Sequence, residues 1–570
     1  MMKLFQKSCV LLLFAAAPLF AQSEIREQGL VTNDPFWRQA LGGAVLSLPS
    51  VQAQSAVVAL DGGNIRAYST SGKPLWNFSA RGKLSPFVTR SREGSSYFSR
   101  TNGIFIAVNR VGRELWRRDL GDPLCAGVVT GWDGRLFVPV EKKIFCYTAS
   151  GTLLWTKVLE APFLIAPRLD HNGGIVFALN NNEIYSTDHF GNTKISPLTK
   201  TPPVALVPAS QTQIIVLYKD GTMEELKFPE DEKLPPKGKT KRPAFPKLSA
   251  LPKLPSNPLA AIGKDGNIAV IMNDGRLAFV SVDNRKIIWS GDTHIREMIK
   301  LRGKPDMEAE MLFDERGIYV LTKNGATGFT KDGKRLWFTN LHNAASIPAF
   351  GNDGVLYSGG NDWILYSYKI EDRVLAEIND LYGPIPEGTY GMGRPQIFDT
   401  LDIPFSENEK TAKLAEITEG INSGNVGENE PVWTSFLLTI SAGKEYILLR
   451  LGALKLLGKI GSQETIPWLV NIFLKENEPA IRTAAVLTIG EIGVDPEGLA
   501  IETFLHSLTY DGSLKDETIL IALAQATGAL CRFSGPPLSG TGIRILTMLN
   551  APNYPQIVRK QANKELASIK

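Results

Sequence analysis

The sequence has few of the residues that carry covalent, acid–base or metal chemistry. Of its 570 residues only four are Cys and five are His. No two histidines stand at a spacing typical of a metal site, and no G-x-S-x-G, H-E-x-x-H or P-loop motif occurs. We therefore expect neither an enzyme nor a metal centre. The histidines are His171, His189, His294, His342 and His506.

Long apolar runs are equally scarce, and the one at the N-terminus is short. Lys3 and Lys7 flank the start of an apolar stretch, CVLLLFAAAPLF, and Ala21 offers a small residue for cleavage. This order is typical of a secretory signal peptide over residues 1–21, and the run is too short to anchor in a bilayer. No later stretch approaches roughly eighteen uncharged apolar residues. The sequence thus predicts an exported, periplasmic protein that is soluble after cleavage and has no transmembrane segment.

Charge and cysteine content exclude further classes. The net charge is +4, and losing Lys3 and Lys7 with the leader leaves about +2, too little for a general nucleic-acid binder. Three cysteines then remain, and an odd number leaves at least one without an intramolecular partner. None stands in a C-x-x-C spacing, so we expect each thiol to be buried as a small apolar side chain. They are Cys125, Cys146 and Cys531.

What the sequence does contain is a repeat of about forty residues. A Trp closes one strand-like run after another, in steps of 39, 40 and 39 residues, and Ile195 takes its place 40 residues later in a degraded copy. The gap of 94 residues from 195 to 289 fits two units plus an insertion. We expect these residues to be structural: Trp37, Trp76, Trp116, Trp155, Trp289 and Trp337.

Tight turns subdivide each unit into three or four short antiparallel strands. Type I′ hairpins need positive φ at both central residues, which Gly and Asn tolerate best. Eight such units predict an eight-bladed antiparallel β-propeller over residues 35–377. The turn pairs include Asn102–Gly103, Asp220–Gly221, Asp274–Gly275, Asn324–Gly325, Asn361–Asp362 and Asp265–Gly266.

The first Trp has no blade of its own. The segment PFWRQAL around Trp37 follows no earlier strands, whereas the last unit, near residues 347–370, departs from the Leu-Trp pattern. We expect the N-terminal segment to complete that last blade, because such a clasp leaves no open sheet edge.

The repeat resembles a known family. The stretch LFVPVEKKIFCYTASGTLLW (136–155) is similar to the propeller repeat named after pyrroloquinoline quinone enzymes, as is IRAYSTSGKPLW (65–76). The resemblance covers about residues 35–377. One branch of the family holds quinoprotein dehydrogenases, which use the quinone with calcium and a disulfide between adjacent Cys. The other contains cofactor-free scaffolds, such as the propeller subunit of the outer-membrane β-barrel assembly machinery.

The missing adjacent Cys pair and C-x-x-C-H motif favour the second branch, so we expect no cofactor. Two alternatives stay open. One is a quinone- or carbohydrate-binding propeller with quinoprotein dehydrogenase-like activity. The other is a redox sensor built on Cys125 and Cys146, although the predicted register puts them roughly 9–10 Å apart, on the first and third strands of one blade. That separation exceeds disulfide reach.

Residues 229–258 interrupt the repeat between the fifth and sixth blades. They contain eight Pro and seven Lys or Arg against three acids, which is typical of an extended, basic segment. A solvated loop is the simpler interpretation. The alternative is a docking arm for an acidic partner or a glycan. Its basic residues are Lys237, Lys239, Lys241, Arg242 and Lys247.

After residue 377 the pattern becomes helical. A linker over 378–405 is rich in Gly and Pro, and Ser406 with Glu409 forms a capping box that opens a helix. RLGALKLLGKIG (450–461) and RTAAVLTIGEIG (482–493) align position for position and resemble HEAT-type repeats, over about residues 406–570. We therefore predict a helical solenoid. Its repeated Arg is expected to bond helix-end carbonyls or a turn carboxylate, at Arg450, Arg482 and Arg559.

Both predicted folds are platforms for binding rather than reaction sites. The sequence predicts a non-catalytic, exported scaffold of the cell envelope that binds envelope proteins and lies peripheral to the outer membrane. Nucleic acid is not an expected partner.

Overall fold

The computed structural model describes residues 34–52, 55–196, 201–211, 213–226, 251–293, 308–341, 343–351, 353–370, 406–495, 497–510, 514–533 and 538–569. The predicted signal peptide, the basic residues of the predicted docking arm, the 378–405 linker, His294 and His342 lie outside the described residues.

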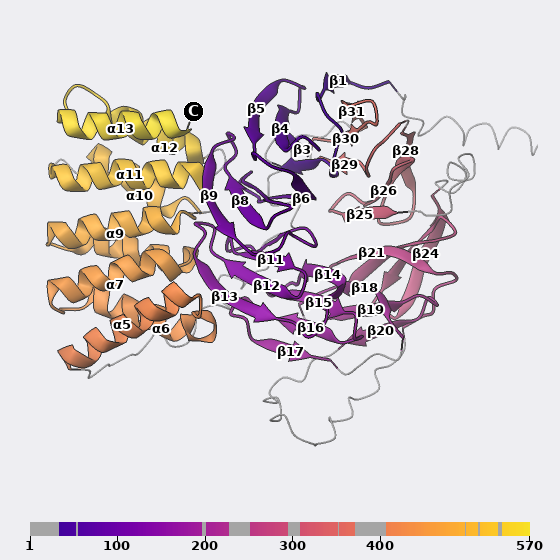
Figure 1. Ribbon diagram of the computed structural model, residues 1–570, viewed down its shortest axis with the longest axis horizontal. Helices are drawn as coiled ribbons and strands as arrows, with labels where there is room; N and C mark the ends of the chain where they lie inside the picture. The colour runs from indigo at the N-terminus through magenta and orange to yellow at the C-terminus, as the bar shows by residue number, and fades with distance from the viewer. Residues whose placement is uncertain are drawn as a thin grey trace, which may run out of the picture.

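Eight antiparallel sheets form a ring, and the described helices stack beside it (Figure 1). Seven sheets have four strands, and the fifth has three within the described residues. Within a blade the first and third turns lie on one face of the ring and the second turn on the other, because successive strands reverse direction. Blade 1 is β2 (Ser50–Gln52), β3 (Ser55–Ala59), β4 (Asn64–Ser69) and β5 (Pro74–Ser79); blade 2 is β6 (Leu84–Arg90), β7 (Ser96–Arg100), β8 (Ile104–Val108) and β9 (Glu114–Asp119); blade 3 is β10 (Val129–Thr130), β11 (Leu136–Val140), β12 (Lys143–Tyr147) and β13 (Leu153–Val158); blade 4 is β14 (Phe163–Leu169), β15 (Ile175–Leu179), β16 (Ile184–Thr187) and β17 (Thr193–Ile195).

The second half of the ring continues in the same order and ends with a blade built from both ends of the propeller. Blade 5 is β18 (Pro203–Pro208), β19 (Ile214–Tyr218) and β20 (Met223–Leu226); blade 6 is β21 (Pro258–Lys264), β22 (Asn267–Met272), β23 (Arg276–Ser281) and β24 (Lys286–Asp292); blade 7 is β25 (Ala309–Phe313), β26 (Ile318–Thr322), β27 (Gly325–Phe329) and β28 (Arg335–Asn340); blade 8 is β29 (Ala349–Phe350), β30 (Val355–Gly359), β31 (Ile364–Lys369) and β1 (Trp37–Ala40).

The predicted clasp is confirmed. Strand β1 pairs antiparallel with β31, with Trp37 opposite Ser367 and Ala40 opposite Ile364. The N–H of Phe36 also donates to the carbonyl of Ser367 at 2.7 Å. The outer strand of the last blade therefore comes from the first described strand of the chain, which closes the ring.

The blade tryptophans link each blade to the next. The indole Nε1–H of Trp37 donates to the carbonyl of Thr70 at 2.8 Å, in the third turn of blade 1. Its ring lies over Gly72, where an added Cβ would fall 2.7 Å from Trp37 Cδ2. Gly72 has φ +82° as well, so both space and backbone require glycine there. The same indole-to-carbonyl bond recurs from Trp76 to Arg110, Trp116 to Ala149, Trp155 to His189 and Trp289 to Lys331.

This link changes around blade 5. Strand β17 of blade 4 has no Trp, and the receiving position in blade 6 holds Arg285 with φ +52°. Arg285 instead lies 3.9 Å from the carboxylate of Glu225, in blade 5. An ion pair therefore takes the place of one indole contact. Trp337 is buried in blade 7 and stacks on Tyr319.

The prediction of type I′ turns was largely wrong. Only Asp265–Gly266 has positive φ at both residues, +52° and +70°. At Asn102–Gly103 only the glycine does, and its N–H donates to the carbonyl of Arg100, three residues earlier. A type I turn followed by one left-handed residue also closes a hairpin, and it needs one glycine rather than two permissive residues.

The predicted insertion was too long at its C-terminal end. Leu251 and Leu254 are buried, and Pro258 begins β21. The N–H of Leu254 donates to Gly221, just as Leu120, after the fourth strand of blade 2, donates to Gly103. Residues 251–253 thus lie where the fourth strand of blade 5 would end, and Pro252 has no backbone N–H to donate to a strand ladder. The interruption lies inside blade 5 rather than between blades 5 and 6.

The C-terminal helices form two layers. Helices α7, α9, α11 and α13 contact one another in sequence in one layer, and α8, α10 and α12 form the other (Figure 1). The capping box of Ser406 and Glu409 is confirmed at the start of α5. Periodicity did not indicate α6 and α12. The α-helices are α5 (Glu407–Ser423), α6 (Glu430–Ala442), α7 (Ile447–Ile460), α8 (Ile466–Lys475), α9 (Pro479–Ile492), α10 (Leu499–Tyr510), α11 (Glu517–Phe533), α12 (Leu538–Leu549) and α13 (Gln556–Ile569), with short 3₁₀ turns η2 (Gly427–Asn429) and η3 (Gln463–Thr465).

Two further observations concern the cysteines and the membrane. Cys146 and Cys531 are buried as expected, but Cys125 is exposed, because it lies in the connection before β10 rather than inside a blade. Across the described helices, none is both long and apolar enough to cross a bilayer.

We predict that Trp37→Ala destabilises the propeller by about 3 kcal/mol, because it removes the indole contact and the aromatic packing on Tyr68 and Tyr357. Urea unfolding followed by far-UV circular dichroism measures the change. Phe36→Ala is the matched control, since Phe36 is the neighbouring aromatic and is exposed. Equal unfolding midpoints for the two variants would contradict the role of the clasp.

Candidate functional site: the interface between propeller and helical repeats

The helical repeats rest on the turns of blades 3 and 4. The connection from α5 to α6 contacts the start of β13 in blade 3 and the third turn of blade 4, and the segment after α9 contacts the first turn of blade 3. A single hydrophobic core runs across the boundary, from Phe137, Cys146 and Trp155 in the blades to Val426 and Leu457 in the helical region. The two domains therefore share buried apolar surface instead of being joined by a linker alone.

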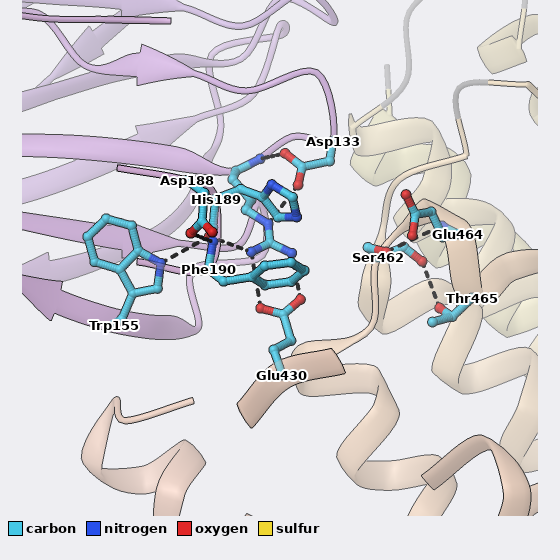
Figure 2. A network of polar contacts seen from close by, with 10 residues as sticks. Asp133, Trp155, Asp188, His189, Phe190, Glu430, Ser462, Glu464 and Thr465 are labelled. Carbon is cyan, nitrogen blue, oxygen red and sulfur yellow. Dashed lines mark hydrogen bonds and ion pairs between the residues drawn. The ribbon is translucent and has the colours of Figure 1, made fainter. Parts of the chain in front are cut away.

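A buried arginine lies at the centre of this interface. Arg135 follows the first turn of blade 3, and its Nε contacts Asp133 Oδ2 at 2.6 Å. Its Nη1 donates to Glu430 Oε2 at 3.0 Å, and its Nη2 donates to Glu430 Oε1 at 2.5 Å. This fork-to-fork geometry is the strongest form of an arginine–carboxylate pair. Figure 2 shows the Glu430 carboxylate directed from the start of α6 toward the blade residues.

The turn of blade 4 completes the cage around Arg135. The carbonyl of His189 accepts one hydrogen bond from Arg135 Nη1 at 2.8 Å and another from Trp155 Nε1 at 3.0 Å. The guanidinium carbon also lies 5.5 Å from the centre of the Phe190 ring. The indole link between blades 3 and 4 and the ion pair to the helices thus meet at one carbonyl oxygen (Figure 2).

The electrostatics of the pair follow from its burial. Burial alone would lower the pKa of Arg135, but the charges of Glu430 and Asp133 outweigh it and raise that pKa above its ordinary value. Burial raises the pKa of Glu430, and Arg135 opposes the rise. Both side chains are less than a tenth exposed. A buried charge with so little hydration destabilises the fold unless its oppositely charged partner is present.

Backbone contacts and small residues bring the α5–α6 connection close to the blades. The N–H of Val426 donates to the carbonyl of Leu154, in β13, at 2.8 Å. Gly424 caps α5 in the left-handed conformation, with φ +66°. An added Cβ at Gly424 would lie 2.4 Å from Leu153 Cδ2. Glycine is therefore needed for the cap and for the approach of the helix to the propeller.

The repeated arginines of the helical region bond within the solenoid. Arg450 Nε donates to the carbonyl of Ser441 at 3.0 Å, and its guanidinium pairs with Glu476. Arg482 Nε donates to the carbonyl of Phe473 at 2.9 Å. The structure places both at the end of the preceding helix. Arg559 differs, because its Nε is buried with no acceptor among the described residues.

Sequence reasoning did not identify this interface. Asp133–Gly134 has the same Asp-Gly form as other turns of the repeat, which predicts a turn but gives no role to Arg135 after it. Glu430 stands at the first position of α6 before a Pro, a pattern typical of a helix start. That pattern predicts the helix but not the partner of the carboxylate. Among the described residues, no three His, Cys, Asp or Glu side chains gather in a metal-binding group.

Two family models match the two parts of the chain. A family model described as outer membrane protein assembly factor BamB matches residues 100–221, and a model of HEAT repeats matches residues 434–524. No curated protein matches the sequence. Similar solved structures include BamB from Moraxella catarrhalis, with 12% identity over 60% of this chain and 99% of that one (TM-score 0.41). Saccharomyces cerevisiae Sqt1 has 10% identity over 59% and 98% (TM-score 0.43), and the designed Ika8 protein has 13% over 60% and 99% (TM-score 0.44).

We predict that Glu430→Gln lowers stability by about 3 kcal/mol, because it leaves the buried Arg135 without its carboxylate partner. Differential scanning calorimetry should show a lower unfolding temperature and separate transitions for the propeller and the helices. Glu428→Gln is the matched control, since Glu428 is exposed in the same connection. Identical thermograms for the two variants would contradict this account.

A second prediction concerns pH. Burial and the positive charge of Arg135 lower the pKa of His189 to about 4. The unfolded chain binds that proton near pH 6.5, so the unfolded state holds more protons between these values. Stability is therefore expected to fall as the pH decreases from about 6.5 toward about 4. His189→Gln should flatten this part of a plot of Tm against pH, and an unchanged slope would contradict the assignment.

Together, the blade repeats, the ring of eight sheets and the two matched family models establish the chain as a PQQ-like β-propeller fused to C-terminal HEAT repeats.

Proposed function

We propose that the protein is a non-catalytic scaffold of the cell envelope that binds partner proteins on the surfaces of its propeller and helical repeats. The observation that carries this proposal is the buried interface around Arg135 and Glu430. Two folds that present broad binding surfaces are held there in one fixed orientation. A scaffold needs that property, because a fixed orientation lets one partner contact both surfaces without the entropic cost of aligning the two domains.

The proposed location rests on the sequence and on the matched family. Lys3, Lys7 and the apolar run before Ala21 have the order of a secretory signal. The family whose model matches blades 2 to 5 is described as an outer membrane protein assembly factor. We infer that the mature chain begins after Ala21, in the periplasm, and works peripheral to the outer membrane with envelope proteins as partners.

The experiment uses the full chain purified from its own envelope fraction. Chemical crosslinking followed by mass spectrometry should return the same partner peptides linked to both the propeller and the helical repeats. Glu430→Gln should reduce these double links at least several-fold at a temperature where the variant remains folded, and Glu428→Gln should not. N-terminal sequencing of the purified protein should begin at Gln22.

Two outcomes would overturn the proposal. One is the absence of any reproducible crosslinked partner from envelope extracts. The other is turnover of an alcohol or sugar after addition of the quinone and calcium, which would indicate a quinoprotein dehydrogenase.

A further inference from the structure

The described first strands of the eight blades carry four ionisable residues. The closest contacts between neighbouring blades involve these strands, so they border the axis of the ring (Figure 1). Two of the four charges are bonded within the fold. Arg90 donates three hydrogen bonds to backbone carbonyls, and Lys264 forms an ion pair with Glu315 at 2.6 Å. The other two residues, Arg168 and Glu310, are held differently.

Arg168 and Glu310 face the axis of the ring. Both residues are exposed although they stand in first strands, and so are Leu164 and Ala166 on the same strand as Arg168. A first strand is flanked by the second strand of its own blade and by the neighbouring blades. An exposed residue in such a strand therefore opens onto the space around the axis, and solvent reaches both charges from inside the ring.

Arg168 reaches across the ring from blade 4 to blade 6. Its Nη1 donates to the carbonyl of Ala261, in β21, at 2.9 Å, so the side chain passes blade 5. The register of β14 shifts between Ile165 and Arg168, and such bulges often redirect a side chain next to a functional site. The first strand of blade 6 packs against β25, which carries Glu310. The guanidinium and the Glu310 carboxylate are thus brought to one side of the axis.

The two charges influence each other but are not bonded to each other. Burial lowers the pKa of Arg168 and raises the pKa of Glu310, and in each case the charge of the other residue opposes the shift. No ion pair joins them in the described part of the chain, where Arg168 has the Ala261 carbonyl as its acceptor and Glu310 accepts no hydrogen bond. Charges that solvent reaches and that are still partly desolvated lie in a confined space rather than on an open surface.

The opposite signs of the two charges limit which ligand can bind. An anion at Arg168 would meet the negative charge of Glu310, and a cation at Glu310 would meet the positive charge of Arg168. A polycarboxylate is disfavoured for the same reason. A small zwitterion suits both residues, because its carboxylate fits the planar guanidinium fork and its ammonium donates to a carboxylate.

We propose that Arg168 and Glu310 form an axial binding site for a free α-amino acid, whose carboxylate pairs with Arg168 and whose ammonium pairs with Glu310. The two charged groups of an α-amino acid are attached to one carbon, which suits protein charges that lie near each other without contact. Leu164 and Ala166 add apolar surface on the strand that carries Arg168. The site goes beyond the proposed scaffold function, because it lies inside the ring and not on its turns.

The test uses the purified full chain and the common L-amino acids, each added singly. At least one amino acid should bind in isothermal titration calorimetry and raise the Tm. Its N-acetyl and amide forms should bind at least tenfold more weakly, because each form lacks one of the two charges.

Two variants test the residues themselves. Glu310→Gln and Arg168→Gln should each weaken binding of that amino acid at least tenfold. Glu310→Gln keeps the size of the side chain and breaks no bond to a described residue, so its Tm without ligand should match that of the unaltered protein. Glu315→Gln is the matched control, because Glu315 is an acid of the same blade that pairs with Lys264 and not with Arg168. It should bind as the unaltered protein does.

Three results would overturn the proposal. The first is that no amino acid binds, and a lower Tm of Glu310→Gln would then assign the two charges to the stability of the ring. The second is equal binding of the N-acetyl or amide form, which would indicate a site for an anion or a cation only. The third is unchanged binding by Glu310→Gln. The crosslinking of envelope partners is a separate measurement, so failure of the scaffold function would be recognised independently.

Discussion

Closure of the ring is the constraint on which the rest of the structure depends. Without β1 the last blade would be a three-stranded sheet with an unpaired edge. Blade 1 would also lose the Trp37 indole that bonds its third turn. Here the closing pair joins residues 330 positions apart, Trp37 and Ser367. The entropic cost of closing a loop grows only slowly with its length. A pairing between residues so far apart can therefore form once the intervening blades have folded. The same strand then carries the indole that packs on blade 1.

The links between blades also determine where the helices attach. Five of the indoles bond the third turn of the following blade, so these turns form a row along one face of the ring. In blades 3 and 4 this row supports the helical region: the His189 carbonyl is bonded by Trp155 and by Arg135, which in turn pairs with Glu430. The geometry that holds two blades together therefore also orients the buried ion pair. Apolar residues would bury the same surface in several arrangements, whereas the buried Arg135–Glu430 pair requires one geometry that keeps both charges bonded.

The two faces of the ring consequently differ in character. The first turn of blade 3 and the third turn of blade 4 contact the helical region, whereas the second turns lie on the opposite face of the ring. Blade 5 departs from the regular pattern on both sides, with an ion pair between Arg285 and Glu225 in place of an indole contact. The indole links run without interruption from blade 8 through blade 4, and the contact with the helical region falls on blades 3 and 4 within that stretch.

The sequence alone determined the number of blades, the clasp and the helical repeats, because these follow from local signals that recur at a fixed period. A Trp at regular steps, Gly or Asn in most turns and a capping box at Ser406 and Glu409 each act within a few residues. It could not determine the turn type, since Asn102–Gly103 is compatible with both a type I′ turn and a type I turn followed by a left-handed glycine. Nor could it find Arg135 and Glu430, which are 295 residues apart and are paired only because the packed helices bring the start of α6 onto blade 3. Only the tertiary structure decided that contact, because burial turns two ordinary charged residues into partners that neither domain can leave unpaired.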